Sequence, residues 1–413
     1  MKRRHFLHTS LALPFAAGCS AMKPAMHGPG LVDTPEKRAR YLAKMLKELC
    51  TDLGPHPSGS PEDHRAAQII IREMGRSLPV VELDATTFTR WVLKGQPEFS
   101  IGDKQYETYP AHGTGGTPPT GLTGVLKKSG PKEKIPYTLV DRSSGKTLAR
   151  VALSESWATG LAVSRPYQMY DKEPGGLPTF NLGVKEIPSL DAAAANGTAV
   201  RVKAVVEFIP NSTTSSVIGT IPGESRDEII LFAHYDTVYN SQGANDNTAS
   251  VIVPIMIAHS LAGGRPKKTL TFLATAGEEY NYLGTIHYAA KRKKEGTLGA
   301  IKLLMNFDSI TWGPNMEIGT RSEELWNLIQ QIDRNLNIPG TPVWLKSDGL
   351  EREARPFKDA GVQALGMVMG SNGYTNNSLW HRPEDTADRV PVDCAEISFL
   401  LFREFMKRIQ DIV

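Results

Sequence analysis

The chain has 413 residues, of which 40% are hydrophobic and 22% are charged, and its formal net charge is +3 at pH 7. This composition is ordinary for a soluble globular protein, and the length predicts two to three domains of about 150 residues each. A net charge this small does not imply a nucleic-acid partner, and we expect none.

The first 22 residues have the pattern of an export signal. Three basic residues at 2–4 precede a mostly apolar stretch at 6–17, which is too short to cross a membrane as a helix. The arginine pair resembles a twin-arginine signal, and the sequence AAGC resembles a lipoprotein processing site that would leave Cys19 lipid-modified. The alternative is ordinary cleavage near Ala21. Both interpretations predict an exported protein, either periplasmic or held at a membrane by a lipid anchor.

Two further cysteines, Cys50 and Cys394, lie in helix-like segments near the two ends of the mature chain. A disulfide can persist in an oxidising compartment, and chain ends often lie close together, but the sequence leaves this pairing open. Neither cysteine has the CxxC spacing of a zinc or redox motif.

The N-terminal part of the mature chain is predicted to be helical over 35–78, with a break in the Gly- and Pro-rich stretch at 54–60. Short strand-like runs follow at about 80–100. From about 101 to 211, Gly, Pro, Thr and Ser punctuate further short strand-like runs, which is typical of a β structure. We therefore expect a mostly β domain inserted at 101–211, with the linker that leaves it at 210–214.

Residues 212–413 alternate between strand-like and helix-like segments. This alternation predicts an α/β fold, in which 35–100 and 212–413 together form a mostly parallel central sheet flanked by helices. Strands are expected at 216–221, 229–233, 269–274, 301–307 and 362–369, and helices at 251–261, 282–292, 322–337 and 395–409.

The polar residues that are candidates for chemistry follow predicted strands. In open α/β sheets, ligands bind beyond the carboxyl ends of the strands, so residues distant in the chain are expected to converge at one edge. The candidates are His234, Asp236, Asp246, Glu278, Glu279, Asp308 and His381.

Imidazoles and carboxylates in this number suit two zinc ions. Five ligands serve two ions if one carboxylate bridges them, and Asp246, in the middle loop, is the best bridge. One ion would then be held by His234, Asp246 and Asp308, and the other by Asp246, Glu279 and His381. Two such ions about 3.5–4 Å apart polarise a carbonyl group and supply a hydroxide near neutral pH.

Two carboxylates remain for other roles. Glu278 is placed to take a proton from the attacking water and to pass it to the leaving amine. Asp236 leaves the strand on the same face as His234 and would accept the other ring N–H of that histidine, which fixes its tautomer. Each motif alone is more often structural, so the metal interpretation depends on all of them following strand ends.

Six segments resemble the co-catalytic di-zinc exopeptidases, the group of bacterial leucyl aminopeptidases and glutamate carboxypeptidase. They are LGPHPSGSPEDHRAA, AHYDTV, GANDNTAS, AGEEYNYLGT, NFDSI and LWHRPEDTADRV. The resemblance covers most of 35–100 and 212–413 and implies the same ligand and base roles, position by position. The insert resembles a protease-associated domain through LPTFNLGVKEIPSLDAAAANGTAVRV, and such a domain would rim the site and restrict substrates.

The chain departs from the family in a charged stretch at 351–355, in a loop expected to border the substrate pocket. The resemblance implies a zinc-dependent exopeptidase, first of all an aminopeptidase acting on exported or environmental peptides. Glu279 and Asp246 are the candidates for binding the free amine of the substrate.

Three alternatives to an aminopeptidase stay open. A carboxypeptidase or dipeptidase is the first. A glutaminyl-cyclase-like enzyme is disfavoured because that branch works with one zinc. A non-catalytic, metal-stabilised binding module is disfavoured because it does not need Glu278. The sequence does not decide the oligomeric state.

Overall fold

The structure is a computed structural model that describes residues 30–130, 135–153, 161–164, 175–371 and 379–413. The predicted export signal and Cys19 lie outside the described residues and stay predictions. Within the described ranges, no helix combines the length and the apolar character needed to cross a membrane.

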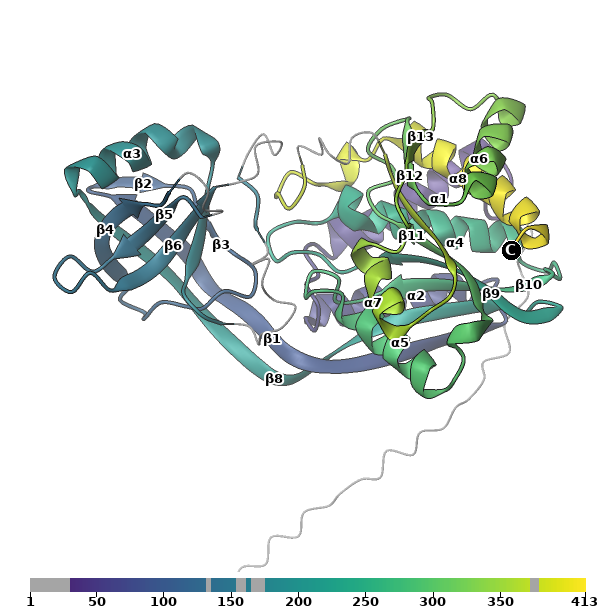
Figure 1. The fold of residues 1–413 in the computed structure, drawn as a ribbon, viewed down its shortest axis with the longest axis horizontal. Helices are drawn as coiled ribbons and strands as arrows, with labels where there is room; N and C mark the ends of the chain where they lie inside the picture. The colour runs from purple at the N-terminus through teal and green to yellow at the C-terminus, as the bar shows by residue number, and fades with distance from the viewer. Residues whose placement is uncertain (1–29, 131–134, 154–160, 165–174, 372–378) are drawn as a thin grey trace, which may run out of the picture.

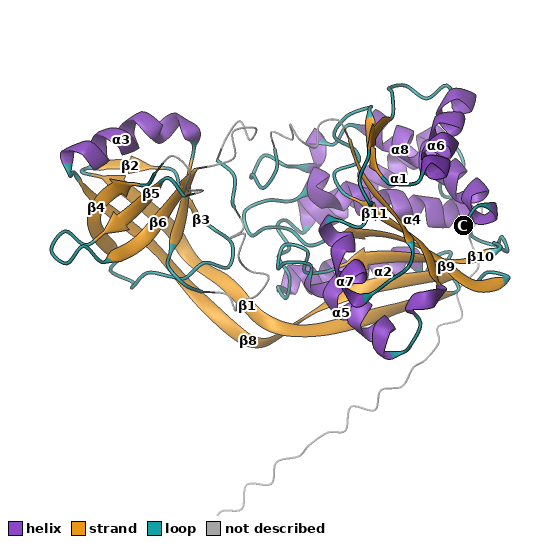
Figure 2. Cartoon of the chain, in the orientation of Figure 1, coloured by secondary structure: helices purple, strands orange, loops and turns teal. Residues whose placement is uncertain are grey.

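The molecule has two lobes joined by two long antiparallel strands (Figure 1). These strands are β1 (Val80–Ile101) and β8 (Ala199–Ile221), which pair with each other along most of their length. Helices gather mainly in one lobe, and the other lobe is mostly strands (Figure 2).

The larger lobe is built on a central sheet whose four middle strands run parallel, in the order β14-β11-β9-β10. Strand β10 pairs with β8 in the antiparallel direction, and β12 pairs with β14 in the same way. The strands are β9 (Ser225–His234), β10 (Lys268–Thr275), β11 (Ile301–Phe307), β12 (Met316–Gly319), β13 (Val343–Leu345) and β14 (Leu365–Ser371).

Helices cover both faces of this sheet. Successive residues of the middle strands point to opposite sides, and because both sets are apolar, each face needs a cover. Ile229 and Leu231 belong to one hydrophobic core and Ile230 and Phe232 to the other. Helices α1 (Pro35–Leu46), α2 (Pro61–Met74), α4 (Ala249–Leu261), α6 (Glu323–Leu336) and α8 (Val392–Arg408) contribute to the first core, and α5 (Leu283–Lys294) and α7 (Arg355–Ala360) to the second. The predicted α/β class is confirmed.

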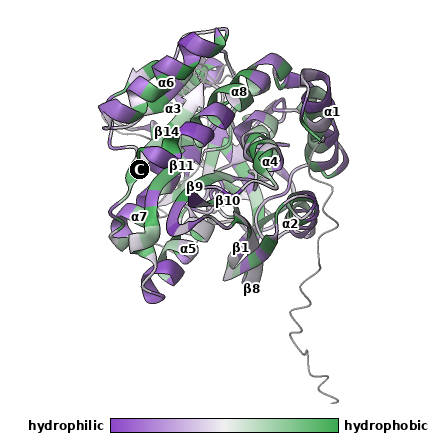
Figure 3. Ribbon diagram, turned by 90° about the vertical axis from the view of Figure 1, so that its right-hand side faces the viewer, coloured by the Kyte–Doolittle hydropathy of each residue, from purple (hydrophilic) through white to green (hydrophobic). Residues whose placement is uncertain are grey.

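Helix α4 is the most deeply placed helix of this lobe. Every residue from Ala249 to His259 is buried, as expected for a helix that is apolar all round. Figure 3 shows hydrophobic residues concentrated in the central strands and α4, inside helices with hydrophilic outer sides. Because α4 follows the loop that carries Asp246, its burial gives that loop a rigid base.

The smaller lobe has a hydrophobic core of its own, which includes Phe99, Tyr137 and Phe180. Its strands are β2 (Lys104–Tyr106), β3 (Tyr109–Pro110), β4 (Leu122–Lys128), β5 (Tyr137–Val140), β6 (Thr147–Leu153) and β7 (Thr179–Leu182), and its helix is α3 (Ile187–Asn196). Strands β1 and β8 contribute residues to both cores, so the chain passes between the lobes inside continuous strands.

The chain returns from the smaller lobe at the predicted position, 210–214, but as a strand and not as a loop. These residues belong to β8, where Ser212 pairs with Phe88 and Thr214 with Thr86. The polar run suggested a loop, but it is the part of a long strand that crosses between two cores, where fewer side chains are covered. The cysteines left open by the sequence, Cys50 and Cys394, are both buried and free of any disulfide.

Candidate metal centre

The structure brings the five predicted metal ligands together at the carboxyl ends of the parallel strands. Among the described residues, three sets of three place one ligand atom of each residue within 4.8 Å of the others, and two of these sets share Asp246. The two that share Asp246 are His234, Asp246 and Asp308, and Asp246, Glu279 and His381; the third is His234, Glu278 and Glu279.

Asp246 lies between the two histidines, with one carboxylate oxygen toward each. Its Oδ1 is 3.4 Å from His234 Nε2, and its Oδ2 is 3.5 Å from His381 Nε2. Glu279 Oε1 lies 3.0 Å from the same nitrogen of His381. A carboxylate held between two ligand sets in this way has the arrangement expected of a bridge.

The loop of Asp246 is held by Asp385, a buried residue that the sequence analysis missed. Its Oδ2 accepts the backbone N–H of Asp246 at 3.0 Å, and its Oδ1 accepts the backbone and side-chain N–H groups of Asn245 at 2.9 and 3.0 Å. Its place in the sequence could have identified it, because Asp385 lies four residues after His381 in the segment LWHRPEDTADRV. One loop thus supplies a ligand and the group that orients the bridge.

Asp236 has a different role from the one predicted. The ring Nδ1 of His234 donates to the backbone carbonyl of Asp236 at 3.1 Å, whereas the carboxylate Oδ1 is 3.7 Å from that nitrogen. Strand β9 ends at His234, so the alternation of side chains on which the prediction depended does not extend to Asp236.

The Asp236 carboxylate instead holds the loop that carries the two glutamates. It accepts the backbone N–H groups of Glu278 at 3.0 Å and Glu279 at 3.2 Å, and the hydroxyl of Ser58 at 2.9 Å. Ser58 lies in the N-terminal segment LGPHPSGS, whose part in the site sequence reasoning did not assign. Asp236 therefore orients both glutamates through their backbone.

His381 is oriented by the backbone of Val163, in the part of the chain predicted as an insert. Its ring Nδ1 donates to the backbone carbonyl of Val163 at 2.7 Å, and its backbone carbonyl accepts the N–H of Val163 at 3.1 Å. Both metal-site histidines therefore carry their ring proton on Nδ1 and leave Nε2 facing the ligand sets. No sequence signal pointed to Val163, because its contribution comes from backbone atoms alone.

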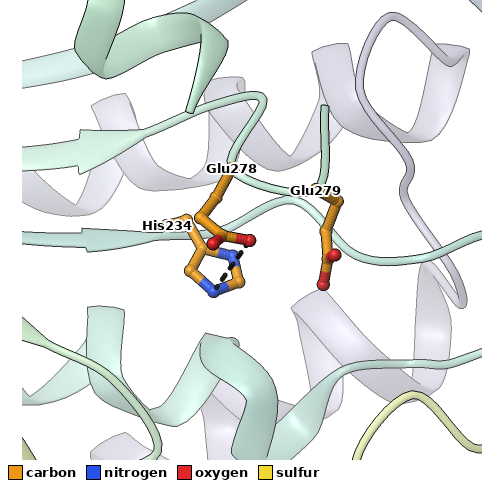
Figure 4. Close-up of side chains that lie close together, drawn as sticks. All are labelled: His234, Glu278 and Glu279. Atoms are coloured by element: carbon orange, nitrogen blue, oxygen red, sulfur yellow. Dashed lines mark ion pairs between the residues drawn. The ribbon is translucent and has the colours of Figure 1, made fainter. Parts of the chain in front are cut away.

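Glu278 and Glu279 are consecutive, but their carboxylates serve different parts of the site. Figure 4 shows the Glu278 carboxylate over the ring of His234 and that of Glu279 to one side. Glu278 Oε2 lies 3.9 Å from His234 Nε2, and Glu279 contacts His381. Glu278 is in neither set that contains Asp246, but it forms the third set with His234 and Glu279, one residue from each of the other two sets.

The electrostatics of the site favour a bound cation. Burial raises the pKa of Asp236 to about 8, and burial together with repulsion from Asp246 raises that of Asp308 to about 6. Burial alone would lower the pKa of His234, but the carboxylates around it, Glu278 first, raise it well above its usual value. So many buried carboxylates are costly unless a positive ion neutralises them.

The donor atoms fit zinc. Imidazole nitrogen and carboxylate oxygen are its common ligands apart from thiolate. Asp246 Oδ2 is buried and has no hydrogen-bond donor among the described residues, as expected for an atom reserved for an ion.

The sequence of residues 216–406 matches the model of peptidase family M28. The chain is 21% identical to aminopeptidase YwaD of Bacillus subtilis over 396 residues, which cover 90% of this chain and 85% of that protein. Its structure is similar to that of BSAP, a zinc aminopeptidase from Bacillus subtilis, with a TM-score of 0.69 and 18% identity over 89% of this chain and 94% of that one. It is also similar to a peptidase M28 precursor from Shewanella amazonensis SB2B, with a TM-score of 0.72 and 16% identity over 91% and 95% of the two chains.

Proposed function

Because residues 216–406 belong to peptidase family M28, we propose that the chain is a zinc-dependent aminopeptidase that uses two zinc ions. The similarity to proteins described as an aminopeptidase and a zinc aminopeptidase supports the activity and the metal. The observation that carries the count of two ions is Asp246, whose oxygens lie toward two different histidines at 3.4 and 3.5 Å.

The residues of the site divide into two ligand sets. His234 and Asp308 would hold one ion, Glu279 and His381 the other, and Asp246 would contact both. When bound, such ions polarise the scissile carbonyl and lower the pKa of a water molecule toward neutrality.

Glu278 would act as the general base. Its carboxylate takes a proton from the attacking water and gives it to the leaving amine nitrogen, so the residue ends the cycle as it began. Asp236 keeps it in place by accepting the N–H groups of Glu278 and Glu279. The ring Nδ1 protons of His234 and His381, fixed by backbone carbonyls, keep the opposite nitrogens available as ligands.

The acidic surroundings favour a substrate with a free amine, which Glu279 or Asp246 would bind. The two complete ligand sets argue against a cyclase-like enzyme with one zinc, and the position of Glu278 argues against a pure binding module. A carboxypeptidase or dipeptidase remains the second proposal. We also propose export with an anchor at Cys19, which follows from the sequence of residues 1–22.

The test is hydrolysis of aminoacyl p-nitroanilides by the purified protein, with and without a chelator. We expect chelation to abolish turnover and two zinc ions per chain to restore it. Glu278→Gln should lose turnover while it still binds zinc, and Glu295→Gln, a change at an exposed helix end, should behave as the wild type. Equal activity with chelator or with Glu278→Gln would overturn the proposal, and hydrolysis of N-acetylated substrates would favour the carboxypeptidase.

A further inference from the structure

The two glutamates of the site lie in a loop whose arms run close together. This segment, residues 275–285, is called the glutamate loop, and it leads from the end of β10 into the first turn of α5. Backbone hydrogen bonds of 2.8 and 2.9 Å join the two arms; the pairs are Leu283 with Gly277, and Gly284 with Ala276. The loop from which Glu278 and Glu279 reach the metal centre is therefore narrow at its base.

A side chain distant in the sequence, Glu353, joins the next pair of residues in this register. The hydroxyls of Thr275 and Thr285 both donate to its Oε1 atom, that of Thr285 at 3.0 Å. Its Oε2 atom accepts the side-chain N–H of Asn306, in β11, at 3.3 Å. All four side chains are buried. One carboxylate thus holds both arms of the glutamate loop and ties them to the neighbouring part of the sheet.

The glutamate loop contains two residues in an unfavourable backbone conformation. The φ angle is +73° at Asn281 and +65° at Tyr282, values that residues other than glycine seldom adopt. Such a conformation persists where the surrounding structure enforces it. Asp236 holds one part of the loop, because its carboxylate accepts the backbone N–H groups of both glutamates. Glu353 holds the other part, where the two arms leave the sheet and α5.

The contacts of Glu353 require an acceptor oxygen rather than a negative charge. Its three hydrogen-bond donors, two hydroxyls and one amide, are neutral groups. Within the part of the chain that the structure describes, Asn306 Oδ1 is buried and has no donor. If the Asn306 amide turned over, this oxygen would accept an N–H from a neutral amide at position 353. An amide there would therefore leave none of these groups unpaired.

We propose that Glu353 is a positioning residue for the general base, because its acceptor oxygen fixes both arms of the loop from which Glu278 acts. This inference rests on the proposed peptidase activity and adds a residue to its machinery. It also gives a role to the charged stretch 351–355, where the chain departs from its family. A displacement of a reacting group by about 1 Å costs about 100-fold in rate, so the chemical step depends on a fixed loop.

The experiment removes the acceptor oxygen and then restores it, with an aminoacyl p-nitroanilide as substrate and saturating zinc. Glu353→Met has a similar length and no acceptor oxygen, so it should lower kcat by about 10- to 100-fold. The loss should be in kcat, because the base acts in the chemical step. Glu353→Gln keeps one acceptor oxygen for the two hydroxyls and supplies an N–H for Asn306 Oδ1, so it should retain most of the wild-type kcat.

Thr285→Val provides a milder change that carries the test if Glu353→Met does not fold. It removes one of the two hydroxyls and keeps the shape of the side chain, so kcat should fall by a smaller factor. Combined with Glu353→Met, it should cause no further loss, because both changes remove the same hydrogen bond. Glu351→Met is the matched control, the same change at a partly exposed residue of the same stretch, and it should keep the wild-type kcat. A zinc count and a thermal melt of each variant show whether both ions and the fold are retained.

Three outcomes would overturn the inference. Glu353→Met could melt at a lower temperature and keep the wild-type kcat, which is the result of a residue that only stabilises the fold. Glu353→Gln could lose as much kcat as Glu353→Met, which would mean that the acceptor oxygen is not what matters. Glu351→Met could lose as much kcat as Glu353→Met. Failure of the proposed function is a distinct result, because the wild type would then hydrolyse no aminoacyl p-nitroanilide.

Discussion

Asp385 should control metal binding although it is in neither ligand set. Its carboxylate accepts three hydrogen bonds, from the backbone of Asp246 and from the backbone and side chain of Asn245. Replacing it with asparagine leaves one acceptor oxygen and places an NH₂ group against at least one of these donors. A buried donor left without an acceptor costs about 1–3 kcal/mol, and this cost falls on the loop that positions Asp246.

We therefore expect Asp385→Asn to weaken zinc binding by about 10- to 100-fold, the range usual for groups that orient metal ligands. Both ions should be affected, because Asp246 is common to both sets. The measurement is competition between the protein and a chromophoric chelator. Asp388→Asn is the matched control, since Asp388 lies in the same loop with its side chain 80% exposed.

The stability of the metal-free protein separates this effect from misfolding. Burial raises the pKa of Asp385 to about 6, so its charge at pH 7 is costly to the folded state. Asparagine carries no charge, and the removal of this cost offsets the lost hydrogen bond. The free energy of unfolding in urea, measured without metal, should therefore change little. Wild-type zinc affinity in Asp385→Asn, or an equal loss in Asp388→Asn, would refute the reasoning.

Three further predictions concern the base, the ions and a buried acid. Glu278→Gln should lower kcat by about 10²- to 10⁴-fold while two zinc ions stay bound. Steady-state kinetics and metal analysis measure the two quantities, and a smaller loss of kcat would exclude Glu278 as the general base. Zinc at 100 times the Kd of each site should raise the unfolding free energy in urea by about 2.7 kcal/mol per ion, or about 5.4 kcal/mol for two ions, and no change would mean that the folded site binds no zinc. Burial raises the pKa of Asp63 to about 6, so its charge costs stability increasingly as the pH rises from about 4 to 6. Asp63→Asn should therefore gain stability relative to the wild type by about 2–3 kcal/mol between pH 4 and pH 8, and a constant difference would contradict this.

The convergence of the ligands was predictable because two local signals agreed. Each parallel strand is marked by an apolar run, and a polar residue such as His234 or Asp308 stands where the run stops. Parallel strands share one carboxyl edge, so their order in the sheet did not need to be known to expect the residues to meet. The structure places all five within two overlapping sets.

The predictions that were wrong concern residues at or beyond the end of a regular pattern of side chains. The role of Asp236 followed from strand alternation, but β9 stops at His234, and the carboxylate turns to the glutamate loop. The run 210–214 looked like a linker because Ser and Thr are common in loops, yet pairing with β1 extends β8 through it. In both cases a partner distant in sequence decided the local conformation.

Sequence patterns cannot predict the contact between Val163 and His381, because only backbone atoms make it. As a result, the two histidines of the centre are oriented by different parts of the chain. His234 is oriented by the backbone carbonyl of Asp236, two residues away on the same loop. His381 is oriented by the carbonyl of Val163, 218 residues away in the sequence. A displacement of Val163 would therefore disturb the orientation of His381, whereas the hydrogen bond that orients His234 is local. The backbone of Val163 thus acts on the half of the centre that contains His381.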